Sequence, residues 1–196
     1  DNANNSHPHV NPTQVFLGKD IATVNQNTGF PNDTDGHATM VAGVMIANAG
    51  AHLGVSPSAK LFASALVSAA DAQTDQENAV VAMQHVALQN PLGDSRGTVR
   101  AINMSWGYKQ EAPIPFDGTS TVTLGLDWSA RIHDVLYVNP TRNINDGSRA
   151  PLDSYNAITV TGSVKNAMGV FDRTSPGAES VVDVFGRRFT HIVVPA

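Results

Sequence analysis

The chain has 196 residues, of which 41% are hydrophobic and 15% are charged, and its formal net charge is −5. A single domain of this length buries roughly 70% of its unfolded surface, so a self-supporting core is expected. The acidic balance and the lack of a basic run argue against a nucleic-acid partner. The absence of cysteine excludes a disulfide scaffold, a Cys-based zinc site and a thiol nucleophile. No apolar run approaches the roughly 18–20 residues that cross a bilayer.

Short apolar runs alternate with helical patterns along the chain. The predicted helices are Thr39–Ala49, Asp75–Leu88 and Thr121–His133. The predicted strands are Lys60–Leu66, Val99–Met104, Val135–Asn139 and Ala157–Thr161. This alternation favours an α/β fold in which a parallel sheet is covered by helices on both faces, in three layers, with reactive groups at the carboxyl ends of the strands. No repeat or linker divides the sequence, so residues 1–196 are expected to form one domain or part of one.

The apolar residues of two predicted helices indicate which faces are buried. In the second helix the expected face consists of Val80, Val81, Met83, Ala87 and Leu88. In the third helix a less regular stripe consists of Val122, Leu126, Trp128 and Ile132.

A single His follows a Gly turn at the start of the first helix, in the segment D-G-H-A-T-M-V-A-G that begins at Asp35. An imidazole titrates near neutral pH and can both take and return a proton, so His37 is the candidate general base. The small side chains of Ala42 and Gly43 allow the helix to pack closely behind it. A surface or capping role is the alternative for a lone His after such a turn, and the other segments of the chain bear on the choice.

The His segment closely resembles the active-site His segment of the subtilisin-like serine proteases (subtilases), G-H-G-T-H-V-A-G. Ala38 and Met40 stand where the family has Gly and the second His. Further downstream, the run G-V-S-P-S-A-K-L from Gly54 is similar to the family's G-V-A-P-x-A-x-L. These resemblances follow one another in the order found in the family, and they imply a subtilisin-like sheet that is incomplete at its C-terminal side.

The run A-I-N-M-S-W-G, which ends at Gly107, resembles the family's V-I-N-M-S-L-G strand beside the substrate cleft. The resemblance implies that Ser105, Trp106 and Gly107 form a wall of that cleft. Extended backbone just past a buried strand can pair with an extended peptide by edge addition. The expected partner is therefore a polypeptide substrate.

The run N-P-T-R-N that ends at Asn143 lies where the family has A-A-A-G-N. The resemblance implies that the Asn143 amide donates to the oxyanion of the tetrahedral intermediate, where negative charge develops during acyl transfer. A loop Asn that favours a turn is the alternative. Arg142 replaces the family's Gly and Pro140 replaces a small residue, both beside the primary specificity pocket. These changes either reshape the pocket or mark a site without catalytic constraint.

The N-terminal run D-N-A-N-N-S-H-P resembles the family's D-S-G-I-D-x-x-H-P, with one residue fewer before His-Pro. This implies that Asp1 holds the His37 imidazole in the required tautomer. Asp33 and Asp35 are interpreted as turn formers or weak calcium ligands. Calcium is implied by the family as a structural ion, but no ligand set stands out. The H-P-H run at His7 is interpreted as a solvated loop, and no metal site is assigned.

A nucleophile is not evident in the sequence. The run G-T-S-T from Gly118 imitates the family's G-T-S-M-A, but it precedes Asn143 and lacks the A-x-P that should follow. It is expected instead to cap the helix that ends at His133. The family's Ser follows a V-A-P-G segment, which the final V-V-P-A resembles, so the Ser segment is not among these residues. Without that Ser, turnover is expected to fall by about 10⁶, by the precedent of subtilisin itself.

Three explanations fit this pattern: an incomplete piece of a longer protein, a Ser supplied by a second chain, or a non-catalytic relative. The first interpretation is a secreted or cell-envelope serine endopeptidase, without a nucleic-acid or membrane partner. The alternative is a catalytically inactive subtilase-fold structural or binding module. A flavodoxin-like ligand binder is a third reading, but the Gly-rich phosphate loop that it predicts after the first strand is not visible.

Overall fold

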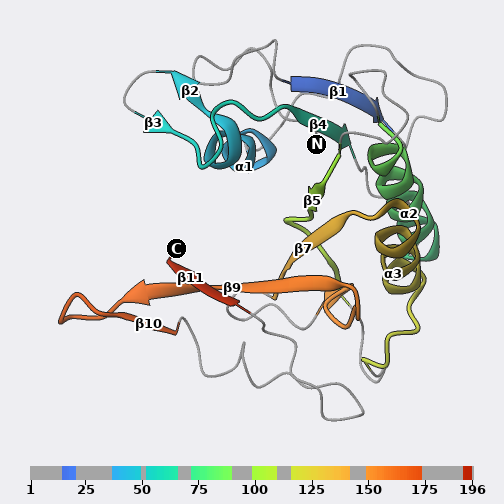
Figure 1. Ribbon diagram of the computed structural model, residues 1–196. Coiled ribbons are helices and arrows are strands. Elements are labelled where there is room, and N and C mark those ends of the chain that lie inside the picture. The colour runs from blue at the N-terminus through green and yellow to red at the C-terminus, as the bar shows by residue number, and fades with distance from the viewer. Residues whose placement is uncertain are drawn as a thin grey trace. The chain divides into compact units, whose positions relative to one another are not determined.

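The computed structural model describes residues 15–20, 37–49, 52–65, 72–89, 99–109, 116–141, 149–173 and 192–195 (Figure 1). The chain divides into two compact units, Asp1–Val99 and Arg100–Ala196. None of the helices within the described ranges is long and apolar enough to span a membrane.

The first unit contains two parallel strands and a helix that packs on them. β1 (Val15–Asp20) pairs with β4 (Leu61–Ala65), beginning with Val15 opposite Leu61. The helix α2 (Ala72–Ala87) contacts both strands. The sequence predicted β4 and α2, but not β1.

The same unit holds a second helix, α1 (His37–Ile46), which starts two residues before the predicted range and ends three residues earlier. It leads into a short antiparallel ladder of β2 (Asn48–Ala49) and β3 (His52–Leu53). Ile46 is 2% exposed and forms the centre of a small apolar cluster, together with Met45, Ala59 and Leu61.

The buried face of α2 differs from the predicted one. Ala79, Met83 and Ala87 are buried as expected for one helical face, whereas Val81 is 53% exposed and Leu88 is 64% exposed. Residues seven positions apart lie on the same side of a helix, so Val81 and Leu88 share the opposite face. The prediction was wrong at these two residues because it followed apolar character and overlooked the small alanines that allow close helix packing.

The second unit is built on a five-stranded sheet in which β5, β7 and β9 are adjacent and parallel. β11 adds in parallel to β9, and β10 forms an antiparallel hairpin with β9 (Figure 1). The bounds are β5 (Ala101–Asn103), β7 (Leu136–Pro140), β9 (Ala157–Lys165), β10 (Phe171–Arg173) and β11 (Ile192–Pro195). The predicted α/β class with a parallel sheet is confirmed. β9 is longer than predicted, and neither β10 nor β11 was foreseen.

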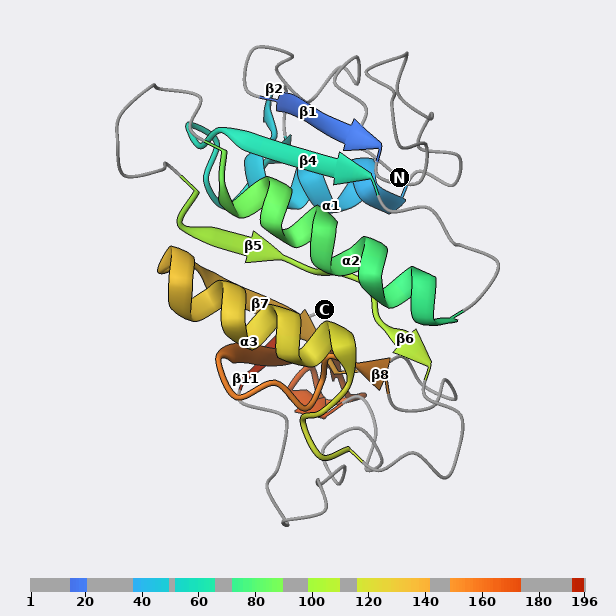
Figure 2. The ribbon, with the colours of Figure 1, turned by 90° about the vertical axis from the view of Figure 1, so that its right-hand side faces the viewer.

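A short antiparallel ladder joins β6 (Tyr108–Lys109) to β8 (Arg149–Ala150), and Figure 2 shows these strands side by side. Neither strand was predicted. A two-residue strand carries no periodic pattern, and its partner is about 40 residues away, so the sequence offers no local signal for it.

The helix α3 (Thr121–His133) has the predicted bounds. Ser120 is its N-cap, and its hydroxyl accepts a hydrogen bond from the Thr123 amide, which confirms the capping role predicted for the G-T-S-T run. The helix ends at His133 and is followed by its C-cap, Asp134, whose φ of 53° lies in the left-handed region that Asp tolerates better than most residues.

One face of α3 packs on β7 and β9 (Figure 2). Val122 and Leu126 are buried as predicted, but Trp128 is 53% exposed and Ile132 is 58% exposed. The buried face is completed by Ser129, seven residues after Val122, rather than by the larger apolar residues. The Ser129 hydroxyl is 2.8 Å from the hydroxyl of Tyr137 on β7, so the helix meets the sheet through a buried hydrogen bond.

Candidate functional site

The candidate base, His37, is the first residue of α1 and is exposed. The helix behind it is almost entirely apolar and buries Ala42 and Ile46. The predicted partners Asp1 and Asn143, and the predicted pocket residue Arg142, lie outside the described residues. Their roles stay predictions.

The G-V-S-P segment binds the C-terminal end of this helix. The amides of Gly54, Val55 and Ser56 donate to the carbonyls of Ala47, Val44 and Met45, at 2.7, 2.9 and 2.8 Å. The last carbonyls of a helix have no partner within it, so these three bonds satisfy groups that would otherwise need water. Two segments that the sequence linked only by resemblance are therefore joined by direct hydrogen bonds.

Gly54 is required by the closeness of this contact. A Cβ at this position would lie 2.6 Å from the amide nitrogen of Ala47 and 2.7 Å from that of Ile46. Both are backbone atoms, which cannot move aside as a flexible side chain can. The glycine thus lets the segment approach the end of the helix that begins with His37.

The predicted cleft wall, Ser105–Gly107, follows β5 directly. The chain is still tied to β7 at Met104, whose amide donates to the Val138 carbonyl at 3.0 Å. The Asn103 amide group donates to the Ser105 hydroxyl at 2.8 Å. The wall thus begins at the carboxyl end of a parallel strand, where α/β proteins place their reactive groups.

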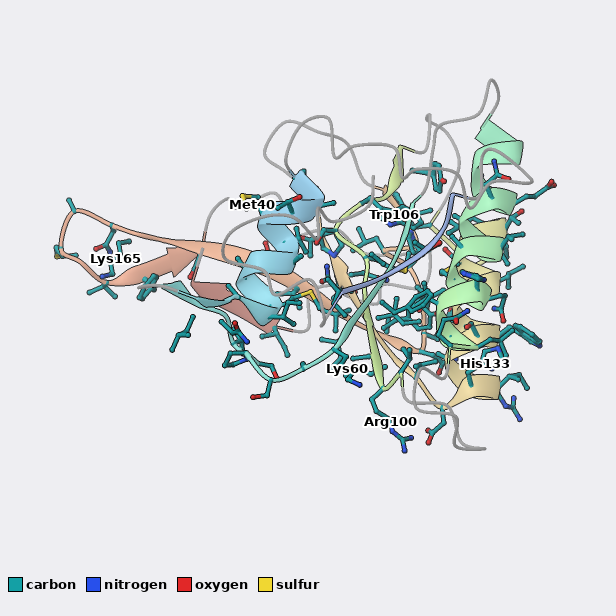
Figure 3. The ribbon with its side chains drawn as sticks, turned by 90° about the horizontal axis from the view of Figure 1, so that it is seen from above. Met40, Lys60, Arg100, Trp106, His133 and Lys165 are labelled. Atoms are coloured by element: carbon teal, nitrogen blue, oxygen red, sulfur yellow. The ribbon has the colours of Figure 1, made fainter. Side chains whose placement is uncertain are left out.

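Trp106 (Figure 3) lies in the middle of the wall, and its ring meets the ring of Tyr108 edge to face, with centroids 5.4 Å apart and planes at 72°. Side chains two residues apart lie on the same side of an extended chain, which explains the contact. Trp106 is only partly buried, so part of its ring stays accessible.

The connection between β8 and β9, which the sequence analysis overlooked, is held by buried hydrogen bonds. Pro151 follows β8, and its carbonyl accepts a hydrogen bond from the side-chain amide of Asn139, on β7, at 3.3 Å. The carboxylate of Asp153 is fully buried and accepts two hydrogen bonds, from the Gly118 amide at 2.9 Å and from the Thr123 hydroxyl at 2.7 Å. Its partners are 35 and 30 residues away, so no local pattern indicated it.

A second carboxylate, Asp127 on α3, holds the rest of this connection. It accepts hydrogen bonds from the Ser154 hydroxyl at 2.6 Å and from the amides of Tyr155 and Asn156 at 3.0 and 2.8 Å. The turn into β9 is therefore anchored to α3 by charge-assisted bonds, which are stronger than bonds between neutral groups.

Two pKa values depart from their ordinary range. Burial raises the pKa of Tyr137 to about 12, and its hydrogen bond to Ser129 offsets only part of this effect. Hydrogen bonds from the Thr119 hydroxyl and amide lower the pKa of Asp117. Neither residue belongs to the predicted site. Tyr137 lies on β7, and Asp117 lies in the loop before α3.

A metal centre finds no support in the described ranges. They contain no group of three or more His, Asp or Glu side chains that could hold an ion. The structural calcium that the resemblance implies stays a prediction without a ligand set.

The Peptidase_S8 sequence model, which describes the subtilase family, matches residues 1–194. The comparison with curated proteins gives no significant match. Among solved structures, the chain is similar to the S41 psychrophilic protease, with a TM-score of 0.68 and 26% identity over 89% of this chain and 55% of that one.

Two further structures share the fold. The subtilase cytotoxin SubAB assembly gives a TM-score of 0.68 and 19% identity, over 100% of this chain and 63% of that one. MycP1 without its N-terminal propeptide gives a TM-score of 0.58 and 14% identity, over 92% of this chain and 62% of that one. The chain thus spans somewhat more than half the length of each of these proteins.

Proposed function

Because the chain belongs to the subtilase family, which matches it over residues 1–194, we propose that it is part of a subtilisin-type serine endopeptidase. The observation that carries the proposal is the position of His37, at the start of a helix whose other end is bound by the G-V-S-P segment. Family membership and the likeness to proteases support peptide-bond hydrolysis as the reaction.

In the proposed mechanism, His37 takes the proton of a serine hydroxyl as that oxygen attacks the scissile carbonyl, and later returns it to the leaving amine. Asp1 accepts a hydrogen bond from the other ring nitrogen and stabilises the imidazolium. The side-chain amide of Asn143 donates a hydrogen bond to the oxyanion. The serine comes from outside residues 1–196, so the proposal expects these residues alone to be inert as a protease.

The proposed substrate is an extended polypeptide that pairs with the backbone of Ser105–Gly107. The support for this is the end of the β5–β7 ladder at Met104, after which the wall continues beyond the sheet. Arg142 would line the primary specificity pocket. A location outside the cytoplasm, secreted or in the cell envelope, is part of the proposal and rests on the composition and the family.

The second candidate is a catalytically inactive subtilase-fold module. It is favoured by the departures from the family at Met40, Pro140 and Arg142. Met40 is 61% exposed on α1, one turn from His37, where the family has its second His.

The two candidates are separated by labelling the longest natural form of the protein with a fluorophosphonate probe, followed by mass spectrometry of the labelled peptide. An endopeptidase incorporates one probe on one serine, and prior denaturation abolishes the labelling. A folded protein that takes up no probe supports the inactive module instead.

A further inference from the structure

We propose that Asp153 is a positioning residue for the peptide-binding wall Ser105–Gly107. This inference rests on the proposed function, since it names the residue that keeps the substrate wall in place. It depends on three links, each within the second unit: from α3 to Asp153, from Asp153 to β8, and from β8 through β6 to Trp106.

The first link fixes Asp153 to the start of α3. Its two carboxylate oxygens accept from the Gly118 amide and from the Thr123 hydroxyl. The Ser120 hydroxyl in turn donates to the Thr123 oxygen at 2.7 Å, which extends the network to the helix cap. Gly118 has a φ of +79°, and a Cβ on it would lie 2.8 Å from the Tyr155 ring, so this position favours glycine.

The second link joins Asp153 to β8. Only two residues separate it from Ala150, and the Ser154 amide donates to the Pro151 carbonyl at 3.0 Å, which closes the turn around Asp153. The same carbonyl accepts from Asn139. The turn is thus held by β7 on one side and by α3 on the other. A change at Asp153 therefore removes one of the supports of the turn that follows β8.

The third link runs from β8 to the wall. Ala150 is paired with Tyr108 in the short β6–β8 ladder. Tyr108 meets Trp106 edge to face, and Trp106 is the central residue of the wall (Figure 3). A ladder of two residue pairs has few bonds of its own, so its position depends on what holds its ends. Release of Asp153 is expected to loosen Tyr108 and, with it, Trp106.

Asp127 offers a matched control within the same connection. It is also a carboxylate that accepts several hydrogen bonds, but its partners, Ser154 to Asn156, lie on the β9 side of Asp153. Loss of Asp127 should therefore loosen the start of β9 first and should move β8 less than loss of Asp153 does. A purely structural role of Asp153 would make the two variants alike, whereas a positioning role makes them differ at Trp106.

The first test uses Trp106 as a reporter in a Trp128→Phe background, where it is the sole tryptophan of the chain. Asp153→Asn leaves a single acceptor oxygen for two donors, so we expect the emission of Trp106 to shift to longer wavelength and its quenching by acrylamide to increase. Asp127→Asn should change both quantities less than Asp153→Asn does. Thr123→Val, which removes one of the two bonds and keeps the carboxylate, should give an intermediate change if Asp153→Asn does not fold.

The second test measures hydrolysis of fluorescein-labelled casein by the longest natural form of the protein. Asp153→Asn should raise KM by about 10-fold while kcat stays within about two-fold of the parental value, because a displaced wall impairs binding more than the chemical step. Asp127→Asn should raise KM less than Asp153→Asn does. A folded Asp153→Asn variant with the parental Trp106 spectrum and parental KM overturns the inference.

Failure of the proposed function has a different signature. In that case the parental protein does not cleave casein at all, and the Trp106 spectra still decide whether Asp153 holds the wall. A Trp106 spectrum that shifts more in Asp153→Asn than in Asp127→Asn supports the positioning role, and identical spectra in both variants contradict it.

Discussion

The described parts of the two units differ in their buried side-chain hydrogen bonds. In the first unit, the described core consists of small and medium apolar side chains, such as Ala42, Ile46 and Met83, and the end of α1 is satisfied by backbone amides. In the second unit, apolar side chains such as Leu126 are also buried, and buried side-chain hydrogen bonds join α3 to Asp153, in the turn before β9, and to Tyr137, on β7.

This difference has a consequence for how each unit responds to substitution. Removal of an apolar side chain from a core lowers the stability of the protein in proportion to the buried apolar area that is lost. Removal of one partner from a buried polar network leaves the other group without its hydrogen bond. The proposed proton-transfer residue His37 thus begins a helix whose described contacts are close packing and backbone hydrogen bonds. The unit that contains the proposed binding wall also depends on buried side-chain hydrogen bonds.

Of the four substitutions that probe this comparison, the one at Asp1 should have the largest effect, and it tests whether the first unit contributes the chemistry. Asp1→Asn is expected to lower kcat on casein by about 10⁴, because the His37 ring would lose the acceptor that sets its tautomer. The measurement is steady-state hydrolysis in the longest natural form of the protein. Asp33→Asn is the control, and an equal loss in that variant would remove Asp1 from the proposed site.

Asn143 tests the contribution of the second unit. Asn143→Ala is expected to reduce kcat by about 10²–10³ with little change in KM, as in the subtilisin precedent for this donor, since the bond forms only in the transition state. The readout is the split between kcat and KM on a peptide substrate. An increase in KM with unchanged kcat would show that Asn143 binds substrate and not the oxyanion.

Gly54 tests whether close packing at the end of α1 stabilises the first unit. Gly54→Ala forces a Cβ against backbone nitrogens at 2.6–2.7 Å. We expect a loss of about 1–3 kcal/mol in the free energy of unfolding, the usual range for overpacking. Urea denaturation followed by circular dichroism gives the value. Gly43→Ala is the matched control, because a Cβ there meets nothing within 4 Å; equal losses in both variants would refute the steric account.

Tyr137 tests how much the buried hydrogen bond to Ser129 stabilises the second unit. The pKa of Tyr137 is raised to about 12 in the folded protein. Its contribution to the free energy of unfolding is therefore complete below the pKa of the unfolded chain, near 10, and is lost as the pH rises toward 12. The shift corresponds to about 2–3 kcal/mol over that window. Tyr137→Phe should cost about 1 kcal/mol at neutral pH, through the unpaired Ser129 hydroxyl, and should flatten the alkaline fall.

Unfolding in urea at about pH 9 and about pH 12 measures this difference for both proteins. A parental protein whose stability falls no more steeply than that of Tyr137→Phe would contradict the assignment of the raised pKa to this residue.

Much of the fold could be predicted from the sequence, because its main signals are local. The bounds of α3 followed from its N-cap and periodicity, and the cap itself was confirmed at Ser120. The parallel strands β5, β7 and β9 followed from their short apolar runs. What could not be predicted depends on distant partners: the Asp153 network joins residues 30 or more positions apart, and no spacing rule connects them.

Of the candidate site, only the positions of His37 and of Ser105–Gly107 can be compared with the structure, and the roles of all its residues stay predictions. His37 was placed correctly at a helix start, and the wall at Ser105–Gly107 follows a parallel strand as expected. The exposed faces of α2 and α3 were misjudged, because the helices pack through Ala and Ser, whose small side chains weaken the apolar signal.

The role of His37 is tested most directly by hydrolysis of casein with parental and His37→Ala forms of the longest natural protein. Loss of the general base should lower kcat by about 10⁶, while the unfolding free energy stays within about 0.5 kcal/mol, since His37 is an exposed surface residue. A His37→Ala protein that cleaves casein at the parental rate would show that the imidazole takes no part in the reaction.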